Sequence, residues 1–249
     1  MNAKPRKLRF TLRTLFLLLT LCAVWFGYQT NTARRQRIAV EAIESAGGHV
    51  RYDYQRDLAN SQGEPKLPGP NWLRKIIGDD HFRRVVEVDW NGKKSFTVDE
   101  LSNLKNLPSL DTLNLNFSGI DDSGLAEIAF LRQLKTLWLE KCDGVTDAGL
   151  ADISQLSNLE DLALLATCCT DSGVQSHIPS LTKLQRLDLA GIPITNDTAK
   201  RLCQLKDLNF VHLGRVGHRA KFDLSDAVAS IKATLPKCTV NYWGPSEQP

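Results

Sequence analysis

Apolar residues recur along most of the chain in blocks that lie about 24 residues apart. Each block has leucine at alternate positions, then a polar turn, and then apolar residues three or four positions apart. The spacings are 24, 25, 25 and 24 residues, counted between the first leucines of the blocks: Leu110, Leu134, Leu159, Leu184 and Leu208. Repetition at a constant period is typical of a solenoid, in which similar units stack side by side.

The pattern within one unit predicts a short strand followed by a helix. Leu113 and Leu115 alternate with Asn114, so the leucines lie on one side of a strand and the asparagine on the other. Leu125 and Ile128 then follow at helical spacing. A single strand and a single helix cannot bury their apolar sides alone, so stacked units must share one core. We therefore expect a parallel sheet on one face and helices on the other.

A separate apolar run precedes the repeats. Residues 10–28 contain one charge, Arg13 near the start, and end in the aromatic residues Trp25, Phe26 and Tyr28. As a helix this run is about 28 Å long at ~1.5 Å per residue, which matches the hydrocarbon thickness of a bilayer. The aromatic end is typical of a membrane interface. We expect an uncleaved transmembrane helix; the alternative, a cleaved signal peptide, lacks its usual small residues at the cleavage site.

The net charge of +3 is unevenly distributed. The first 37 residues hold eight of the 31 lysines and arginines and none of the 28 acidic residues, so the rest has a net charge of −5. Such a body lacks the basic face that nucleic acids require, and we expect no nucleic-acid binding. Five basic residues precede or begin the span and three follow it, which predicts a cytoplasmic N-terminus. The repeat domain would then lie outside the cytoplasm, in the periplasm if the cell is bacterial.

Weaker patterns before the repeats predict an N-terminal cap. Residues 33–46 are predicted to form a helix that ends at Gly47 and Gly48, and residues 49–54 a strand. The apolar side of that helix is expected to hold Ile38, Ala42 and Ile43. Residues 57–71 are rich in Pro, Gly and Asn, which predicts an exposed loop.

Both ends of the repeat array can also be placed. Val85, Val86 and Val88, followed by Asn91, predict a degenerate first repeat about 27 residues before the next one. After the last repeat, Ser225 is expected to cap a helix over residues 226–235, and residues 239–243 to form a closing strand. The predicted regions are a cytoplasmic tail, a transmembrane helix, a juxtamembrane cap and loop, the repeats, and a closing strand with a frayed tail: residues 1–9, 10–28, 29–82, 83–235 and 236–249.

The blocks carry a family motif. They follow L-x-x-L-x-L-x-x-N/C, in which Cys142 takes the last position of its unit and Ser118 and Thr167 take it in theirs. The chain therefore resembles the leucine-rich repeat family, and in particular its cysteine-containing subclass. Ile192 and Val216 occupy that polar position in their units, where we expect looser turns. The resemblance implies an α/β solenoid with a curved parallel sheet on its concave face and helices on its convex face, here behind a transmembrane helix.

A second resemblance covers nearly the whole chain. The chain is similar to membrane-anchored leucine-rich repeat proteins of planctomycete bacteria in the order of three blocks: RFTLRTLFLLLTLCAVWFG, TARRQRIAVEAIESAGGHVRYDY and PGPNWLRKIIGDDHFRRVVEVD. This resemblance implies an anchor and the repeat fold. It implies no established activity.

No catalytic or cofactor motif is present in the sequence. It has no metalloprotease or phosphate-loop signature, and its five histidines lack ligand spacing. The acidic pairs at 79–80 and 121–122 are better explained by helix capping than by calcium binding. Cys142 and Cys169 fall on inward positions and should act as small buried groups; a strained disulfide between Cys168 and Cys169 is the alternative. We expect neither an enzyme nor a metal or other cofactor.

The outward sides of the predicted strands form two columns. The first is predicted to run through Glu87, Asn114, Trp138, Ala163, Asp188 and His212, and the second through Asp89, Asn116, Glu140, Leu165, Ala190 and Gly214. An apolar patch is predicted at the centre, formed by Trp138, Ala163, Leu165 and Ala190 inside a charged rim, as in protein interfaces. The alternative is that Trp138 merely stacks on a neighbouring side chain. The candidate partner-binding residues are Asn114, Asn116, Trp138, Glu140, Asp161, Ala163, Leu165, Arg186, Asp188 and His212.

These patterns favour one function over another. The leading hypothesis is a membrane-tethered interaction module that binds an unknown protein or cell-envelope partner on its concave face. The alternative is a structural protein of the cell envelope without a single specific partner. Capture of a stoichiometric partner would separate the two hypotheses.

Overall fold

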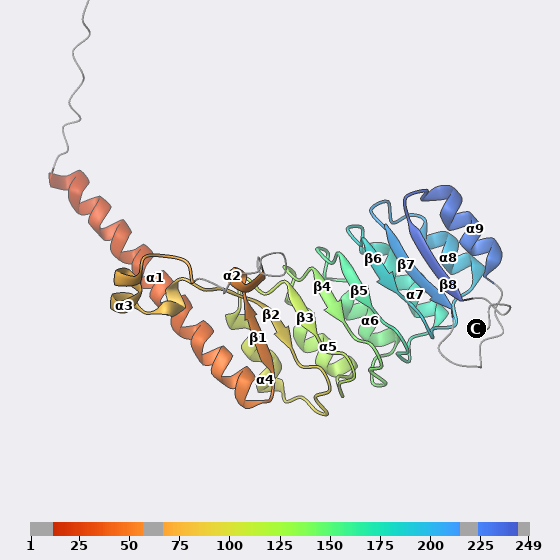
Figure 1. The fold of residues 1–249 in the computed structure, drawn as a ribbon, viewed down its shortest axis with the longest axis horizontal. Helices are drawn as coiled ribbons and strands as arrows, with labels where there is room; N and C mark the ends of the chain where they lie inside the picture. Colours follow the sequence, from red (N-terminus) through yellow and green to blue (C-terminus); the bar gives the residue numbers. More distant parts are fainter. Residues whose placement is uncertain (1–11, 57–66, 215–223, 244–249) are drawn as a thin grey trace, which may run out of the picture.

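The chain forms one long sheet with a row of helices on one side of it (Figure 1). The computed structural model describes residues 12–56, 67–214 and 224–243. Within them the sheet has eight strands in chain order; β1 pairs antiparallel with β2, and all later neighbours pair in parallel. The strands are β1 (His49–Tyr52), β2 (Val85–Asp89), β3 (Thr112–Asn114), β4 (Thr136–Trp138), β5 (Asp161–Ala163), β6 (Arg186–Asp188), β7 (Phe210–Gly214) and β8 (Thr239–Trp243).

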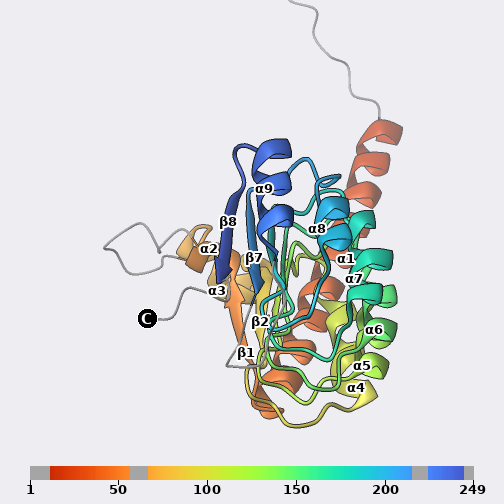
Figure 2. The same ribbon diagram turned by 90° about the vertical axis from the view of Figure 1, so that its right-hand side faces the viewer.

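Helices α4 to α8 follow the strands on the other side of the core (Figure 2). We call this side the helical face and the opposite side the sheet face. The helices are α1 (Leu12–Ser45), α2 (Asp53–Arg56), α3 (Asn71–Ile77), α4 (Val98–Ser102), α5 (Asp122–Ile128), α6 (Asp147–Ile153), α7 (Asp171–His177), α8 (Asn196–Leu202) and α9 (Ser225–Thr234). Short 3₁₀ turns occur at η2 (Asp79–His81), η3 (Asn103–Asn106) and η4 (Ile178–Ser180). The α/β solenoid of leucine-rich repeat type that the sequence predicts is thus the fold of the chain.

The core lies between the two faces and consists mainly of leucine. Leu137, Leu162 and Leu187 stand side by side in register on successive strands, and all three are fully buried. Leu125 and Ile128 of α5 close the core from the helical face, as predicted. One apolar cluster therefore runs through every repeat, so each unit is stabilised by its neighbours.

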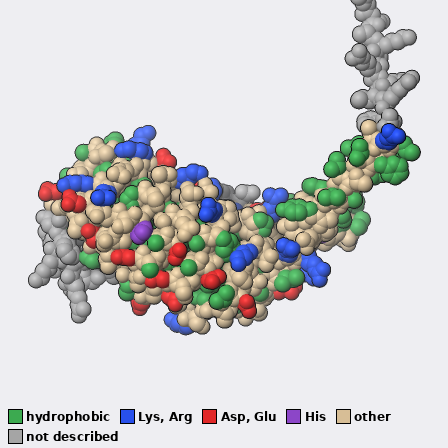
Figure 3. Space-filling view, turned by 180° about the vertical axis from the view of Figure 1, so that it is seen from behind, with side chains coloured by type: hydrophobic (Ala, Val, Ile, Leu, Met, Phe, Trp, Pro, Cys, Tyr) green, Lys and Arg blue, Asp and Glu red, His purple; other side chains and the backbone are tan. Residues whose placement is uncertain are grey.

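Helix α1 is a single helix of 34 residues with two different parts. Its outer part, residues 12–32, projects from the body, and its apolar side chains are exposed (Figure 3). By length and composition α1 fits a membrane-spanning helix, and these properties fit a signal sequence as well. The inner part packs on the first repeat through buried Ala39 and Ile43. Ile38, predicted to be on the apolar side, is 49% exposed, because the buried side is centred on residues 36, 40 and 43 instead.

Gly47 and Gly48 end α1, as the sequence predicts. The Gly48 N–H donates to the carbonyl of Ile43 over 2.9 Å, and Gly47 has a φ of +80°, which favours glycine. Gly48 also lies against Trp90, which is 1% exposed and packs edge-on against Phe96. A side chain at Gly48 would collide with this indole, so the turn and the buried tryptophan require each other.

Several boundaries differ from those expected. Strand β1 ends at Tyr52, because Asp53 starts a helical turn in which its carboxylate accepts from the backbone N–H of Tyr54 over 3.0 Å. Helix α9 starts at Ser225 itself, one residue before the predicted start, whereas β8 covers the predicted range. The predicted basic tail, most of the 57–71 loop, the turn at Val216 and the frayed C-terminal tail lie outside the described residues.

Candidate functional site

The candidate binding residues lie on the sheet face, most of them in the two strand columns that the sequence predicts from the second repeat onward. Asp161 and Arg186 lie in a third column, with Thr136 and Phe210. Asn114, Trp138, Ala163, Asp188 and His212 are neighbours in register on β3 to β7. Backbone hydrogen bonds between the turns place Asn116, Glu140, Leu165, Ala190 and Gly214 in the next column.

The predicted register of the first repeat is wrong by two residues. Asp89, not Glu87, is the neighbour of Asn114, and Glu87 pairs with Thr112. The unit is therefore 25 residues long rather than about 27. The prediction relied on Asn91 as the polar position of the motif. In the structure Trp90 occupies the place of a core leucine, so the motif is shifted along the chain.

Several candidate residues are less accessible than predicted. Asn114 is 7% exposed, Ala163 is 5% exposed, and Ala190 is fully buried, although all three belong to the outward columns. Neighbouring strands are only ~4.8 Å apart, so longer side chains on either side cover small ones. Of the predicted apolar patch, Trp138 and Leu165 are half-buried and keep accessible surface.

Trp138 is held by a charged neighbour rather than standing free. Its indole N–H donates to the carboxylate of Asp161 on the next strand. The Nε of Arg186 lies 3.3 Å from the Oδ2 of that carboxylate, and its guanidinium lies 4.8 Å from the ring centre of Phe210. Burial raises the pKa of Asp161, and the charge of Arg186 and the hydrogen bond from Trp138 oppose that shift. We call Trp138, Asp161, Arg186 and Phe210 the central cluster.

Carboxylates surround the central cluster. Burial and the nearby charge of Asp188 raise the pKa of Glu140, whereas Lys141 opposes the shift. Asp188 itself lies 3.1 Å from the Nδ1 of His212 and accepts from the backbone N–H of Ala190 over 2.9 Å. The sheet face thus presents an aromatic ring among partly desolvated acceptors, which suits a partner that brings polar or cationic donors.

Some candidate residues also have a structural role. The side chains of Asp89, Asn114 and Asp188 each accept a hydrogen bond of 2.9–3.0 Å from the backbone N–H two residues later. Asn116 accepts in turn from the backbone N–H of Glu140 in the next repeat over 2.7 Å. These bonds form the turns at which the strands end. The polar side chains at these positions are therefore explained without a binding partner.

A row of hydrogen bonds at the helix starts was not predicted from the sequence. The carboxylate of each first helical Asp accepts from both the backbone N–H and the hydroxyl of a Thr in the following repeat. The pairs are Asp122 with Thr146, Asp147 with Thr170 and Asp171 with Thr195, over 2.6–3.1 Å. We call these six residues the helix-start row. The Thr-Asp pairs that recur in the sequence could have indicated this row. They were interpreted as helix caps within one repeat, which leaves out the bonds to the next repeat.

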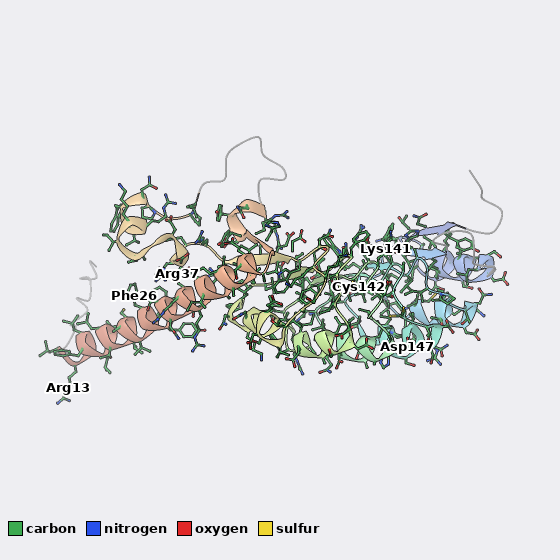
Figure 4. The ribbon with its side chains drawn as sticks, turned by 90° about the horizontal axis from the view of Figure 1, so that it is seen from below. Arg13, Phe26, Arg37, Lys141, Cys142 and Asp147 are labelled. Carbon is green, nitrogen blue, oxygen red and sulfur yellow. The ribbon has the colours of Figure 1, made fainter. Side chains whose placement is uncertain are left out.

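A second row of bonds follows the cysteine position of the motif. The thiol of Cys142 donates to the carbonyl of Leu115 over 3.0 Å and lies 3.7 Å from the hydroxyl of Ser118. Figure 4 shows Cys142 between the two faces, next to Lys141 on the sheet side and apart from Asp147 on the helical side. Thr167 continues the row, and buried Ile192 interrupts it, as predicted. All six cysteines, including Cys168 and Cys169, are free.

These residues define a repeat protein whose sheet face carries a mixed aromatic and charged surface. Among the described residues, no group of three or more His, Cys, Asp or Glu is arranged to hold a metal ion. The fold assignment rests on the chain's own repeats, strands and stacked helices.

Comparisons with known proteins add little to this assignment. No protein-family model matches the chain, and no curated protein matches it. Among solved structures, it is similar to a leucine-rich repeat protein of Leptospira interrogans, with 22% identity, a TM-score of 0.38, and coverage of 59% of this chain and 40% of that one. It is also similar to an internalin of Listeria monocytogenes, with 19% identity, a TM-score of 0.37, and coverage of 65% and 54%. The chain thus spans about half or less of the length of these structures.

Proposed function

We propose that this chain is a membrane-tethered interaction module whose sheet face binds a protein or cell-envelope partner. The central cluster carries the proposal. An aromatic ring, a partly desolvated carboxylate and an arginine meet on the sheet face, and this is the residue composition of interface hot spots. The rest of the sheet face surrounds the cluster with half-exposed polar groups that can form a rim.

The outer part of α1 supports the tether. Its apolar side chains cover about 20 residues and stay mostly exposed, including Trp25, Phe26 and Tyr28 at its inner end, where Phe26 contacts His81. Burial in a bilayer would remove this surface from water, which the fold itself does not do. The excess of basic residues before the span supports a cytoplasmic N-terminus and an extracytoplasmic repeat domain.

The experiment removes the ring and measures capture of the partner. The native protein is purified from membranes after crosslinking, and its stoichiometric partner is identified by mass spectrometry. Trp138→Ala should weaken binding of that partner by at least ~30-fold, because hot-spot truncations typically cost ~2 kcal/mol or more. Phe130→Ala is the matched control, since Phe130 is a partly exposed ring in the turn after α5, outside the strands, and should leave binding unchanged.

The thermal midpoint of each variant separates binding from folding. Trp138→Ala loses the bond to Asp161, so a destabilisation of about 1 kcal/mol is expected. Full binding by the Trp138→Ala protein would refute the role of the sheet face. Absence of any stoichiometric partner would favour the structural alternative. Recovery of the native protein in the soluble fraction after alkaline carbonate washing would refute the tether.

A further inference from the structure

Helix α3 presents large apolar side chains to solvent beside α1. Trp72 is 65% exposed and Ile76 is 71% exposed, and residues four apart lie on the same side of a helix. Leu73 and Ile77, one position later in each case, point instead toward α1 and line a cavity there. Helix α3 is thus apolar on two sides. Its inner side packs toward α1, but within the described part of the chain nothing covers its outer side, which carries Trp72 and Ile76.

Contacts hold α3 level with the aromatic end of the outer part of α1. The ring of His81 in η2 stacks on Phe26 with 6.3 Å between ring centres. Gln36 of α1 is 6% exposed and clamps the next segment: its amide donates to the carbonyl of Arg83 and accepts from the N–H of Val85. The depth of α3 along α1 is therefore set by packing, at the turn that carries Trp25 and Tyr28.

The surroundings of α3 are strongly basic. Residues 29–40 and 71–84 together contain seven Arg or Lys and only two Asp. Both aspartates, Asp79 and Asp80, are paired with arginines of the same region. Arg34, Lys75 and Arg84 are exposed. A basic surface beside an apolar one complements anionic headgroups above a hydrocarbon layer.

A cavity of about 470 Å³ separates α3 and η2 from α1. Its lining combines the apolar and aromatic side chains of Trp25, Phe26 and Leu73 with the polar residues His81 and Arg84. Both ring nitrogens of His81 are buried and have no hydrogen-bond partner within the described residues. These nitrogens are closed off from the cavity, so what the cavity offers a lipid is its apolar lining and Arg84.

We propose that α3 and the basic residues around it are a second membrane contact, which lies in the interface of the bilayer that α1 crosses and binds anionic phospholipid. Trp72 and Ile76 enter the interface, the surrounding arginines and Lys75 meet the phosphates, and the cavity takes part of one lipid. This proposal rests on the proposed tether. A helix with a second contact point cannot tilt or rotate freely, so the repeat domain and its sheet face are held in one orientation to the membrane.

The test uses the full chain in vesicles and measures quenching of tryptophan fluorescence by lipids brominated near the headgroup end of the acyl chain. Five tryptophans are present; Trp25 and Trp72 belong to the two helices at this level, whereas Trp90 and Trp138 lie in the repeats. Trp72→Phe should therefore reduce the quenched part of the emission by about half, because interfacial indoles are the ones within reach of the bromine. Trp138→Phe is the matched control and should leave the quenched part unchanged.

Trp25→Phe separates the proposal from the tether on which it rests. If Trp25→Phe lowers quenching and Trp72→Phe does not, the tether stands and the interfacial position of α3 is refuted. If neither change lowers quenching, both the tether and the proposal fail. Trp72 is mostly exposed and phenylalanine is conservative there, so folding should not limit the comparison.

Lipid charge and a charged variant give a second readout. Quenching of Trp72 should be stronger in vesicles of phosphatidylcholine mixed with phosphatidylglycerol than in phosphatidylcholine alone, and salt should weaken the difference. Ile76→Asp should abolish most Trp72 quenching, whereas Val98→Asp, an equally exposed aliphatic position on α4, should not. Equal Trp72 quenching in both vesicle types would refute the anionic-lipid component, and unchanged quenching with Ile76→Asp would refute the interfacial insertion.

Discussion

The helix-start row and the sheet face belong to the same repeats but are built differently. The helix-start row makes the same bond three times, from an Asp of one repeat to a Thr of the next. The side chains of the sheet face vary more: the same column holds Asn114, Trp138, Ala163, Asp188 and His212, although Asn114 and Asp188 make the same bond to the backbone. Identical bonds between units serve stacking, which every unit needs, whereas stacking does not specify an outward strand residue. The sheet face is therefore the side on which stacking leaves most side chains free to vary, in line with the proposed binding role.

The carboxylates of the two sides also differ in the direction of their pKa shifts. Hydrogen bonds from Ser123 and from the backbone of Gly124 lower the pKa of Asp121, which caps α5 next to the helix-start row. On the sheet face, burial raises the pKa of Asp161 and of Glu140. The surroundings of Asp121 therefore stabilise its charged form, whereas those of Asp161 and Glu140 disfavour the charged form. Carboxylates that are charged at a cost are typical of functional surfaces.

The largest expected effect concerns the core that both sides share. Leu162→Ala should lower the free energy of unfolding by ~2–5 kcal/mol, because it leaves a cavity between fully buried leucines. Urea titration of the full chain in a mild detergent measures it. Leu165→Ala, at a half-buried position on the sheet face, is the control and should cost clearly less. Equal losses for both variants would mean that the inward and outward sides of the strands have been interchanged.

A smaller effect tests the helix-start row. Asp147→Ala removes the acceptor for both the N–H and the hydroxyl of Thr170, and should lower the free energy of unfolding by ~1–3 kcal/mol. Asp197→Ala removes a carboxylate that is 82% exposed and only weakly paired with Lys200, so it should change stability by less than ~0.5 kcal/mol. If the two variants had the same urea midpoint, the row would not link neighbouring repeats.

The smallest expected effect is a pH-dependent change in the free energy of unfolding. Glu140 has a raised pKa in the folded state, so its charge disfavours folding at pH 7, and Glu140→Gln should stabilise the protein by a few tenths of a kcal/mol there. The gain should disappear as the pH falls below the ordinary glutamate pKa of 4.5, where wild type is also neutral. Urea midpoints at pH 7 and pH 4 measure it.

Glu100 is the matched control on the helical face. Burial opposes the shift, but hydrogen bonds from the backbone of Thr97 and from Lys93 outweigh it and lower the pKa of Glu100. Its charge therefore stabilises the fold above the ordinary pKa, and the contribution is lost as the pH falls through the lowered value. Glu100→Gln should thus destabilise at pH 7 and have less effect at low pH. The same sign for both variants at pH 7 would remove the proposed contrast between the two sides.

The repeat period and the alternation of leucines were enough to predict the solenoid, its core and most of its strand register. Leu113 and Leu125 are buried as their spacing requires, because a short-range pattern decides which side of a strand or helix is apolar. The outward columns were equally predictable from the second repeat onward. The first repeat was not, because Trp90 replaces a leucine there and only its packing on Gly48 reveals the register.

Other features depend on contacts between residues that lie far apart in the chain, and these only the tertiary structure decided. The sequence marks Trp138 as outward, yet its bond to Asp161 exists because two strands 25 residues apart are placed side by side. The helix-start row likewise joins residues 23–24 positions apart. The cavity beside α1 brings residues 25–36 next to residues 73–84. The repeat period determines whether a residue faces the core or the solvent within its own unit. The exposure of a side chain, its bonding partners and its pKa depend instead on the side chains that neighbouring units place around it.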